Sequence, residues 1–415
     1  MEIPPAKRLE LLELFAPRLH FDSLERWRPS LADDYLQRSA FLDEDERPQP
    51  GTPPAGAAVL AHLNQLESKV NPLRDGPGLD TQLRGNELLA KYGAGQDLDA
   101  AARCYGRAWT SPNGRAVFLQ YWLFYVDNPC VLPPGRHDGD WELVQVRLWR
   151  RGEDCGPATH VTLAGHGKPV TRPFKSADRG PDVYVAIDSH ASYHEPGAHP
   201  MLPLSDVCTP APGDPGLTPE VTLLDVDEDD RVWANWHGRW GMDSGPGTRV
   251  ALFLGLRRTP AFLRRVKIGA GESPPSPGRQ GASWDRPRTF QARGTQRKWT
   301  NVAVQRLAHL LGEWTWPKAA PAVTVAPAGT GSYSVTAEPA GRGARRVTMA
   351  SVSFEEVPPG GGRRGLAMYS VPADGRARTF EVAHEGPLRW RAAGYNRLRQ
   401  RGEPLGPEEP GAPAQ

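Results

Sequence analysis

The sequence predicts an all-β protein, built as an antiparallel β-sandwich with peripheral helices and followed by a smaller C-terminal β-sandwich. From residue 117 onward, apolar and polar residues alternate with the period of two that places one face of a strand against a core. The chain of 415 residues contains 44 glycines and 43 prolines, which indicate many turns between short strands. This length exceeds what one small core needs, so we expect two domains.

Helices are expected only at the margins of the fold. Residues 7–15 predict a short helix, and residues 26–42 predict a mixture of turn and helix before a break rich in Pro and Gly at 47–57. A further helical pattern, RKWTNVAVQRLAHLLGEW, covers 297–314 after a polar stretch at 270–288.

The main core is predicted to contain four strands. They share alternating Val, Tyr, Trp and Leu residues and are separated by loops of Gly, Pro and Asp. Their segments are AVFLQYWLFYVD at 116–127, WELVQVRLW at 141–149, THVTLAGH at 159–166 and DVYVAIDSH at 182–190.

A domain boundary is expected near residue 318, which divides the chain into domains 1–318 and 319–415. Short alternating segments, such as APAVTVAPAGTGSYSVTAEP at 320–339, predict a small β-sandwich beyond the boundary. The segment LRWRAAGYNRLRQRGEP at 388–404 resembles the last strand and exit of a fibronectin type III domain, which implies that fold for 319–415 with a disordered tail.

Charge and targeting signals narrow the function classes. Lys and Arg number 50 against 48 acidic residues, so the net charge of +2 gives no electrostatic reason to expect nucleic acid as a partner. The N-terminus has no secretory signal pattern and no stretch reaches transmembrane length. We therefore expect a soluble protein that is cytoplasmic or exported by a non-classical route.

The cysteines show no metal or redox spacing. Because they are scattered, we expect buried thiols, and the alternative is a bridge between Cys104 and Cys130 in an exported protein. The four positions are Cys104, Cys130, Cys155 and Cys208.

The stretch GRHDGDWELVQV, at 135–146, places acidic residues at the mouth of the core. In an antiparallel hairpin joined by residues 128–139, Asp127 and Asp140 come to the same edge of the sheet. Strand parity places Asp140 and Glu142 on the apolar face, and Asp127 continues the apolar row of the preceding strand. His137 is expected in the loop above these three carboxylates.

Three carboxylates at the end of a core repel one another unless a positive charge lies among them. A divalent cation is the simplest compensation, and oxygen ligands with one imidazole favour Ca²⁺ or Mg²⁺, with Mn²⁺ as a further candidate and zinc less favoured. The alternative is that the acids are surface groups paired with Arg136 or Arg147.

Several motifs in order resemble the vacuolar protein sorting-associated protein 62 family, whose members carry an HxGDWE-type segment, a GSHASY-type segment and a close rich in Trp and Gly. The resemblance covers most of residues 14–290. The segments that carry it are YWLFYVDNP, GRHDGDWELVQV, DVYVAIDSHASYHEPGAHP and WANWHGRWG.

The HxxDxE pattern is also similar to the central heptapeptide of the necrosis- and ethylene-inducing peptide-like proteins, secreted cytolysins with a β-sandwich and a divalent cation in a surface pocket. This resemblance implies that the metal ligands are Asp127, His137, Asp140 and Glu142. The chain departs from that group because GRHDGDWE stands where the toxins have two histidines flanking an arginine, and because it adds a C-terminal domain. The resemblance implies metal binding more strongly than toxicity.

Further candidates surround this predicted site. His166 and His190 end predicted strands, and we expect His166 to hold a water or act as an acid–base group, while His190 either acts there or fixes a turn. Asp188 shares a strand face with His190 and is a candidate to orient it. Trp236 belongs to a tryptophan cluster that favours a core role over ligand stacking. The acidic run at 225–230 is interpreted as a solvated loop.

Three functions fit this pattern. The first is a binding protein whose cation bridges to hydroxyl or phosphate oxygens of a glycan or lipid headgroup, with activity at a membrane as one form of this function. The second is a metal-dependent hydrolase of a phosphoester or glycoside, in which the cation activates water and His166 or His190 transfers the proton. The third is a protein-interaction module in which the metal only stabilises the hairpin.

Overall fold

The computed structural model describes most of both predicted domains. The described residues are 3–37, 40–41, 70–71, 102–128, 137–166, 168–201, 204–224, 233–236, 240, 274–295, 317–356, 364–382, 384, 388–396, 401–408 and 410. The predicted helix at 297–314 and the acidic run at 225–230 lie outside these residues.

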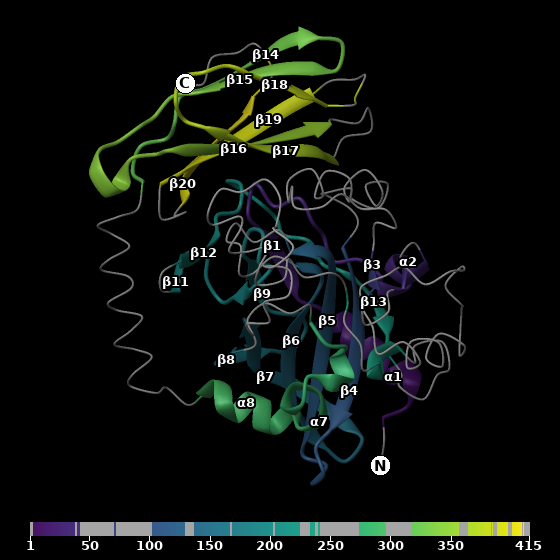
Figure 1. The fold of residues 1–415 in the computed structure, drawn as a ribbon. Helices are drawn as coiled ribbons and strands as arrows, with labels where there is room; N and C mark the ends of the chain where they lie inside the picture. The colour runs from purple at the N-terminus through teal and green to yellow at the C-terminus, as the bar shows by residue number, and fades with distance from the viewer. Residues whose placement is uncertain are drawn as a thin grey trace, which may run out of the picture.

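A six-stranded sheet forms the centre of the N-terminal part (Figure 1). Its strand order is β13-β4-β5-β6-β7-β8, and all neighbours are antiparallel except β13 and β4. The strands are β4 (Arg103–Thr110), β5 (Ala116–Asn128), β6 (His137–Arg151), β7 (Asp154–Gly165), β8 (Lys168–Ser176) and β13 (Glu220–Leu223).

Smaller sheets flank this central sheet. β9 pairs in parallel with β1 and antiparallel with β10, and β11 and β12 form a hairpin. The strands are β1 (Arg18–Phe21), β2 (Ala40–Phe41), β3 (Val70–Asn71), β9 (Asp182–Val185), β10 (Ser192–Tyr193), β11 (Gly197–Met201) and β12 (Leu204–Cys208). The predicted all-β class is therefore confirmed, with two parallel pairings that the sequence did not indicate.

The expected strand at 182–190 is wrong in its second half. β9 ends at Val185, and the following residues form a turn in which Asp188 and His190 have positive φ angles of 64° and 52°. Positive φ is incompatible with an extended strand, so strand parity does not apply to these two residues.

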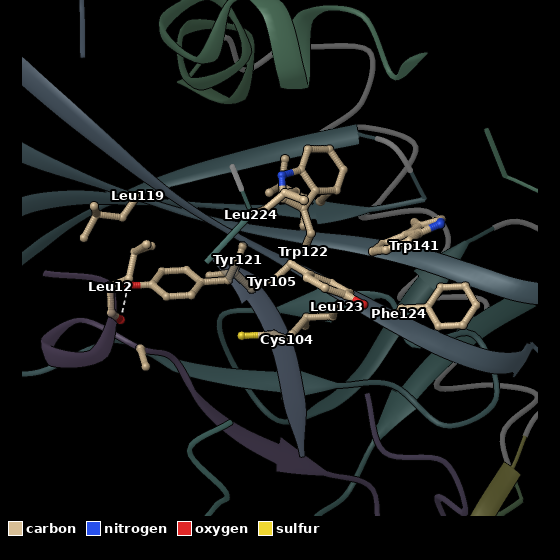
Figure 2. Packing of buried hydrophobic residues seen from close by; sticks show 14 of the residues in the cluster. Leu12, Cys104, Tyr105, Leu119, Tyr121, Trp122, Leu123, Phe124, Trp141 and Leu224 are labelled. Atoms are coloured by element: carbon tan, nitrogen blue, oxygen red, sulfur yellow. Dashed lines mark hydrogen bonds between the residues drawn. The ribbon is translucent and has the colours of Figure 1, made fainter. Parts of the chain in front are cut away.

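β5 is buried along its whole length because both faces of the central sheet are covered. On one face, Tyr121 points toward helix α1 (Pro5–Leu14) and donates a hydrogen bond of 2.9 Å to the Leu12 carbonyl (Figure 2). On the other face, Trp122 packs against Trp284. Two-sided burial explains why the sequence of β5 is nearly all apolar. Cys104 lies in this core as a thiol, and Cys155 is also a thiol. Cys208 is buried and its Sγ donates to the His20 carbonyl oxygen at 3.4 Å, and Cys130 of the alternative bridge lies outside the described residues.

Short helices cover the margins of the sheet, as expected. α2 spans Ala32–Gln37, and α7 (Ala282–Asp285) and α8 (Pro287–Thr295) lie against the second face of the sheet after a 3₁₀ turn at Pro277–Arg279. Gln120 donates to the Ser283 carbonyl, and Gln145 donates to the Pro287 carbonyl at 3.1 Å. These side-chain bonds fix α7 and α8 on the sheet.

The C-terminal residues form a smaller sandwich of a three-stranded and a four-stranded sheet (Figure 1). Alternating residues such as Val323, Val325, Val352 and Trp390 fill the core between them. The strands are β14 (Val323–Gly329), β15 (Ser332–Ala337), β16 (Met349–Glu356), β17 (Arg364–Pro372), β18 (Arg378–Glu381), β19 (Leu388–Tyr395) and β20 (Arg401–Glu408), with a 3₁₀ turn at Gly343–Arg345.

Residues 401–408 form β20 and pair with β19, and the expectation of a disordered tail, which had no stated start, stays a prediction. The first large hydrophobic cluster ends at Phe290 and the second begins at Val323, so the change from one core to the other falls between these two residues. A small third cluster joins them, in which Leu24 packs with Ala393 and Tyr395. Independent folding on either side of residue 318 stays a prediction.

Candidate functional site

The β5–β6 hairpin carries a row of acids into the interior. In its register Tyr125 lies opposite Asp140, and Leu123 lies opposite Glu142. These pairs share the sheet face that also bears Asp127, which is 0% exposed. Parity therefore placed the three acids correctly on one face, at the end of an apolar row.

His190 compensates part of this negative charge. Its ring stacks on Tyr125 with centroids 3.9 Å apart and planes 3° apart, and it is 0% exposed. Its Nδ1 lies 3.1 Å from Asp140 Oδ2, and its Nε2 lies 3.7 Å from Glu25 Oε1. Burial lowers the pKa of His190, but Glu25 and Asp140 outweigh burial and raise the pKa to about 9. The buried ring is therefore an imidazolium at neutral pH.

The pKa values of the two neighbouring acids on β6 are shifted in opposite directions. Burial opposes ionisation of Asp140, but the hydrogen bond from His190, together with nearby His137 and Asn128, holds the Asp140 pKa below its usual range. Burial, Asp140 and Asp206 together raise the pKa of Glu142 well above its usual range. Within the described residues the Glu142 carboxyl has no hydrogen-bond partner. Glu142 is therefore the carboxyl of this cluster whose ionisation the described surroundings oppose most.

Glu25 anchors the other side of His190. Its Oε1 accepts a 2.7 Å hydrogen bond from the Trp27 backbone N–H, and its Oε2 accepts one of 2.7 Å from the Asp188 backbone N–H. The predicted orientation of His190 by Asp188 is therefore corrected, because the acidic partners of His190 are Glu25 and Asp140. Burial and Glu25 raise the pKa of the Asp188 carboxyl.

His137 is the first residue of β6, which corrects its predicted position in a loop. Its Nε2 lies 3.4 Å from Asn128 Nδ2, and its Nδ1 lies 3.1 Å from the Gly139 carbonyl oxygen. In this arrangement Nδ1 is placed to donate to the Gly139 carbonyl oxygen. Asn128 Nδ2 also donates to Asp140 Oδ2 at 3.1 Å, so Asn128 links His137 to the acidic row.

A second polar cluster surrounds Asp206. His166 Nε2 lies 2.5 Å from Asp206 Oδ2, Tyr193 donates to the same oxygen, and Ser189 donates to Oδ1 at 3.0 Å. Burial opposes protonation of His166, but Asp206 and Asp140 raise its pKa. The His166 side chain is 34% exposed, so this dyad reaches the surface, as expected for a residue that follows strand β7.

The cluster around Asp140 and the cluster around Asp206 are close enough to influence each other's pKa values. Asp206 acts on the pKa of Glu142, and Glu142 acts on the pKa of Tyr193. Across the described part of the chain, however, no three His, Cys, Asp or Glu side chains are placed as ligands of one ion. The alternative partner Arg147 lies on the opposite face of β6 from Asp140, and Arg136 lies outside the described residues.

Trp236 lies in the core. It is fully buried and packs edge-on against Trp240, with centroids 5.7 Å apart and planes at 78°. Trp240 Nε1 donates to Ser276 Oγ at 2.8 Å. This packing favours the core interpretation of the tryptophan cluster.

Several residues of the site had not been anticipated. Glu25, Asn128, Tyr193 and Asp206 carry no local motif, and long loops or strand pairings bring them to the histidines. The one sequence feature that pointed to such residues was His190, because a buried histidine in a turn requires polar partners from elsewhere in the chain.

Comparisons with known proteins add little to this geometry. No family model matches the chain, and no curated protein matches it. A solved structure described as the non-toxic HaNLP3 protein is similar at 15% sequence identity with a TM-score of 0.27, covering 57% of this chain and 82% of that chain. At that TM-score the likeness supports no functional assignment, so the family resemblances of the sequence stay predictions. None of the helices among the described residues is long and apolar enough to span a membrane.

Proposed function

We propose that this protein binds an oxygen-rich ligand, a glycan or a lipid headgroup, through a divalent cation at the end of the β5–β6 hairpin. The observation that carries this proposal is Glu142, a buried carboxyl beside Asp140 and Asp206 with no hydrogen-bond partner within the described residues. A cation beside it would offset the burial and the repulsion from Asp140 and Asp206 that together raise the Glu142 pKa.

The donor chemistry fits a hard cation. The residues that would hold it are Asp127, His137, Asp140 and Glu142, which offer carboxylate oxygens and one imidazole from two paired strand ends. Ca²⁺ or Mg²⁺ suits this set best, and Mn²⁺ is the next candidate. When bound, the ion supplies coordination positions for ligand oxygens. The side chains must turn toward a common point to hold it, since they are not placed as a ligand group without it.

The histidines would set the geometry of this site. The buried His190 ring contacts the Asp140 carboxylate through Nδ1, and Asn128, which also lies beside His137, donates a hydrogen bond to the same carboxylate. His166 reaches the surface beside the acids and offers a polar contact to a ligand. The buried hydrogen bonds hold the Asp140 carboxylate in place, and the partly exposed His166 leaves the solvent side of the site accessible to a ligand.

One observation favours a second candidate, a metal-dependent hydrolase of a phosphoester or glycoside. His166 is paired with Asp206, and a carboxylate on one imidazole nitrogen orients the ring as a general base. In that case His166 would accept a proton from water during turnover. We favour binding because the described site presents no nucleophile activated by a histidine.

Binding is tested with glycan arrays and phosphatidylcholine vesicles, with and without a glycosphingolipid, in Ca²⁺, Mg²⁺ or EDTA. We expect cation-dependent binding that Glu142→Gln abolishes and Glu153→Gln preserves, because Glu153 lies exposed in the turn between β6 and β7, at the opposite end of β6 from the acids. Binding that is unchanged by EDTA and by Glu142→Gln contradicts the proposal.

His166→Ala separates binding from catalysis. If the protein only binds, this change weakens affinity modestly. Metal-dependent turnover of a phosphoester or glycoside that His166→Ala abolishes with affinity retained establishes the hydrolase instead. A bound ion whose removal changes stability but no ligand binding establishes the structural role.

A further inference from the structure

A cavity of about 320 Å³ lies at the other end of the β5–β6 hairpin, on the opposite face of the sheet from the acidic row. Its floor includes Phe118 of β5, and its walls include Arg147 of β6 and residues of α8. In Figure 1, α8 lies along the end of the sheet farthest from the C-terminal sandwich. We call this cavity the arginine pocket.

Three arginines line the arginine pocket, and no acidic residue does. They are Arg115 beside the start of β5, Arg147 and Arg288 in the first turn of α8. Within the described part of the chain, none of the three guanidinium groups makes an ion pair or a hydrogen bond. The Nε atom of Arg147 is buried without a partner. Elsewhere arginines such as Arg18, Arg172 and Arg378 are paired with carboxylates.

Polar donors complete the wall. Asn113 accepts hydrogen bonds through Oδ1 from Ser111 and from the Arg115 backbone N–H, which leaves its Nδ2 group available as a donor. Gln291 lines the pocket and is 7% exposed, and its side-chain amide has no partner among the described residues. Because the Gln291 amide atoms are not fully buried, they are accessible to a ligand as a further donor and acceptor.

We propose that the arginine pocket binds a tetrahedral oxyanion, the phosphate or sulfate group of a small molecule. The guanidinium group presents donors in a planar fork that matches phosphate oxygens, and three such groups without acids favour a doubly charged anion. The Phe118 ring and Ala292 offer an apolar surface to the organic part of the ligand. Inorganic phosphate and a phosphate ester share this chemistry, and the experiment distinguishes them.

This site is distinct from the proposed cation site. Arg147 and Asp140 are seven positions apart on β6, which corresponds to roughly 20 Å along a strand. Their side chains also lie on opposite faces, because seven is an odd number of residues. Binding measured in EDTA therefore excludes anions held through a metal at the acidic end.

The test is calorimetric titration of the full chain in EDTA at constant ionic strength, with inorganic phosphate, inorganic sulfate and phenyl phosphate as probes. We expect saturable binding to one site, tighter for phenyl phosphate than for inorganic phosphate because of the apolar floor. Phenol is the control for the ring alone and should not bind. If inorganic phosphate and phenyl phosphate bind with equal affinity, the ligand of the pocket is free phosphate and not a phosphate ester.

Arg147→Gln and Arg288→Gln should each weaken phosphate binding about tenfold or more, which is the loss expected for one charge-assisted hydrogen bond. Arg293→Gln is the matched control, because Arg293 is exposed on the same helix and does not line the pocket. It should change affinity less than twofold. Arg288 is exposed, so its variant keeps the test valid if Arg147→Gln impairs folding. Absence of saturable binding by the wild type, or an equal loss in Arg293→Gln, overturns the proposal.

Discussion

His190 Nδ1 lies 3.1 Å from Asp140 Oδ2, although 50 positions separate the two residues in the sequence. On the other side of the ring, Glu25 approaches Nε2 to 3.7 Å. One imidazolium therefore ties the β5–β6 hairpin, the turn after β9 and the segment after β1 together. It pairs with Asp140 and Glu25 and leaves Glu142 as a carboxyl without a hydrogen-bond partner among the described residues.

Removing this imidazolium should destabilise the protein strongly. His190→Ala leaves two buried carboxylates without their cation, and we expect a loss of about 3 kcal/mol in the free energy of unfolding. His160→Ala is the control, since His160 is only half-buried and contacts Thr159. Urea denaturation at pH 7 measures both. A loss below about 1 kcal/mol in His190→Ala would contradict the pairing described.

Gly139 is required for the close approach of the hairpin to the tryptophan core. Its φ is +64°, and a Cβ atom there would overlap the Trp240 carbonyl oxygen. Gly152 has a similar φ of +62° but open space around it. Thermal unfolding should show a loss of about 1 kcal/mol for Gly152→Ala and several times more for Gly139→Ala. Equal losses in the two variants would show that the overlap is relieved without cost.

Asp182 predicts a pH dependence outside the candidate site. Arg18 Nε donates to Asp182 Oδ1 at 2.6 Å, and His20 Nε2 lies 3.0 Å from the same oxygen. The hydrogen bond from Arg18 outweighs partial burial and lowers the Asp182 pKa from 3.8 to about 2. Because the folded pKa is the lower one, the stabilisation is complete above pH 3.8 and is lost as the pH falls toward 2.

The pair is partly exposed, so solvent screening reduces its contribution to about 1 kcal/mol. Asp182→Asn should therefore lower stability by that amount at pH 7, and the difference from wild type should shrink between pH 4 and pH 2. Urea denaturation across this range provides the measurement. A difference that is constant with pH assigns the loss to packing instead.

Leu24 links the two sandwiches and tests the boundary near residue 318. It is buried against Ala393 and Tyr395, so Leu24→Ala should cost about 2 kcal/mol in the full chain. In a fragment of residues 1–318 this contact is absent, and the same change should cost much less. We expect the fragment to fold, because its large hydrophobic cluster lies entirely before Val323. Aggregation of the fragment, or an equal cost in both chains, contradicts two separable domains.

Strand periodicity predicted the parts of the site that lie on regular strands. β5 and β6 are regular paired strands, so parity placed Asp127, Asp140 and Glu142 on one face. The same reasoning failed for residues 186–190, because positive φ angles at Asp188 and His190 end the alternation. It also placed His137 in a loop, although pairing with Asn128 extends β6 to that residue.

The partners of the histidines lay beyond sequence reasoning for a different reason. The Asp188 N–H binds Glu25 across 163 positions, and His166 binds Asp206 across 40. No periodic pattern fixes such contacts, because they depend on how separate sheets pack. The sequence therefore indicated which acids share one face of the sheet but not that His190 pairs with one of them.

The cation itself is tested most directly by elemental analysis of the full chain purified without chelator and then equilibrated with Ca²⁺, Mg²⁺ or Mn²⁺. We expect about one divalent ion per chain, its loss in Asp140→Ala and Glu142→Gln, and its retention in Glu153→Gln. Removing the ion at neutral pH should also lower stability by a few kcal/mol, since the acids again face one another. A wild-type protein that holds no ion under any of these conditions, with a melting temperature unchanged by EDTA, contradicts a cation-dependent function.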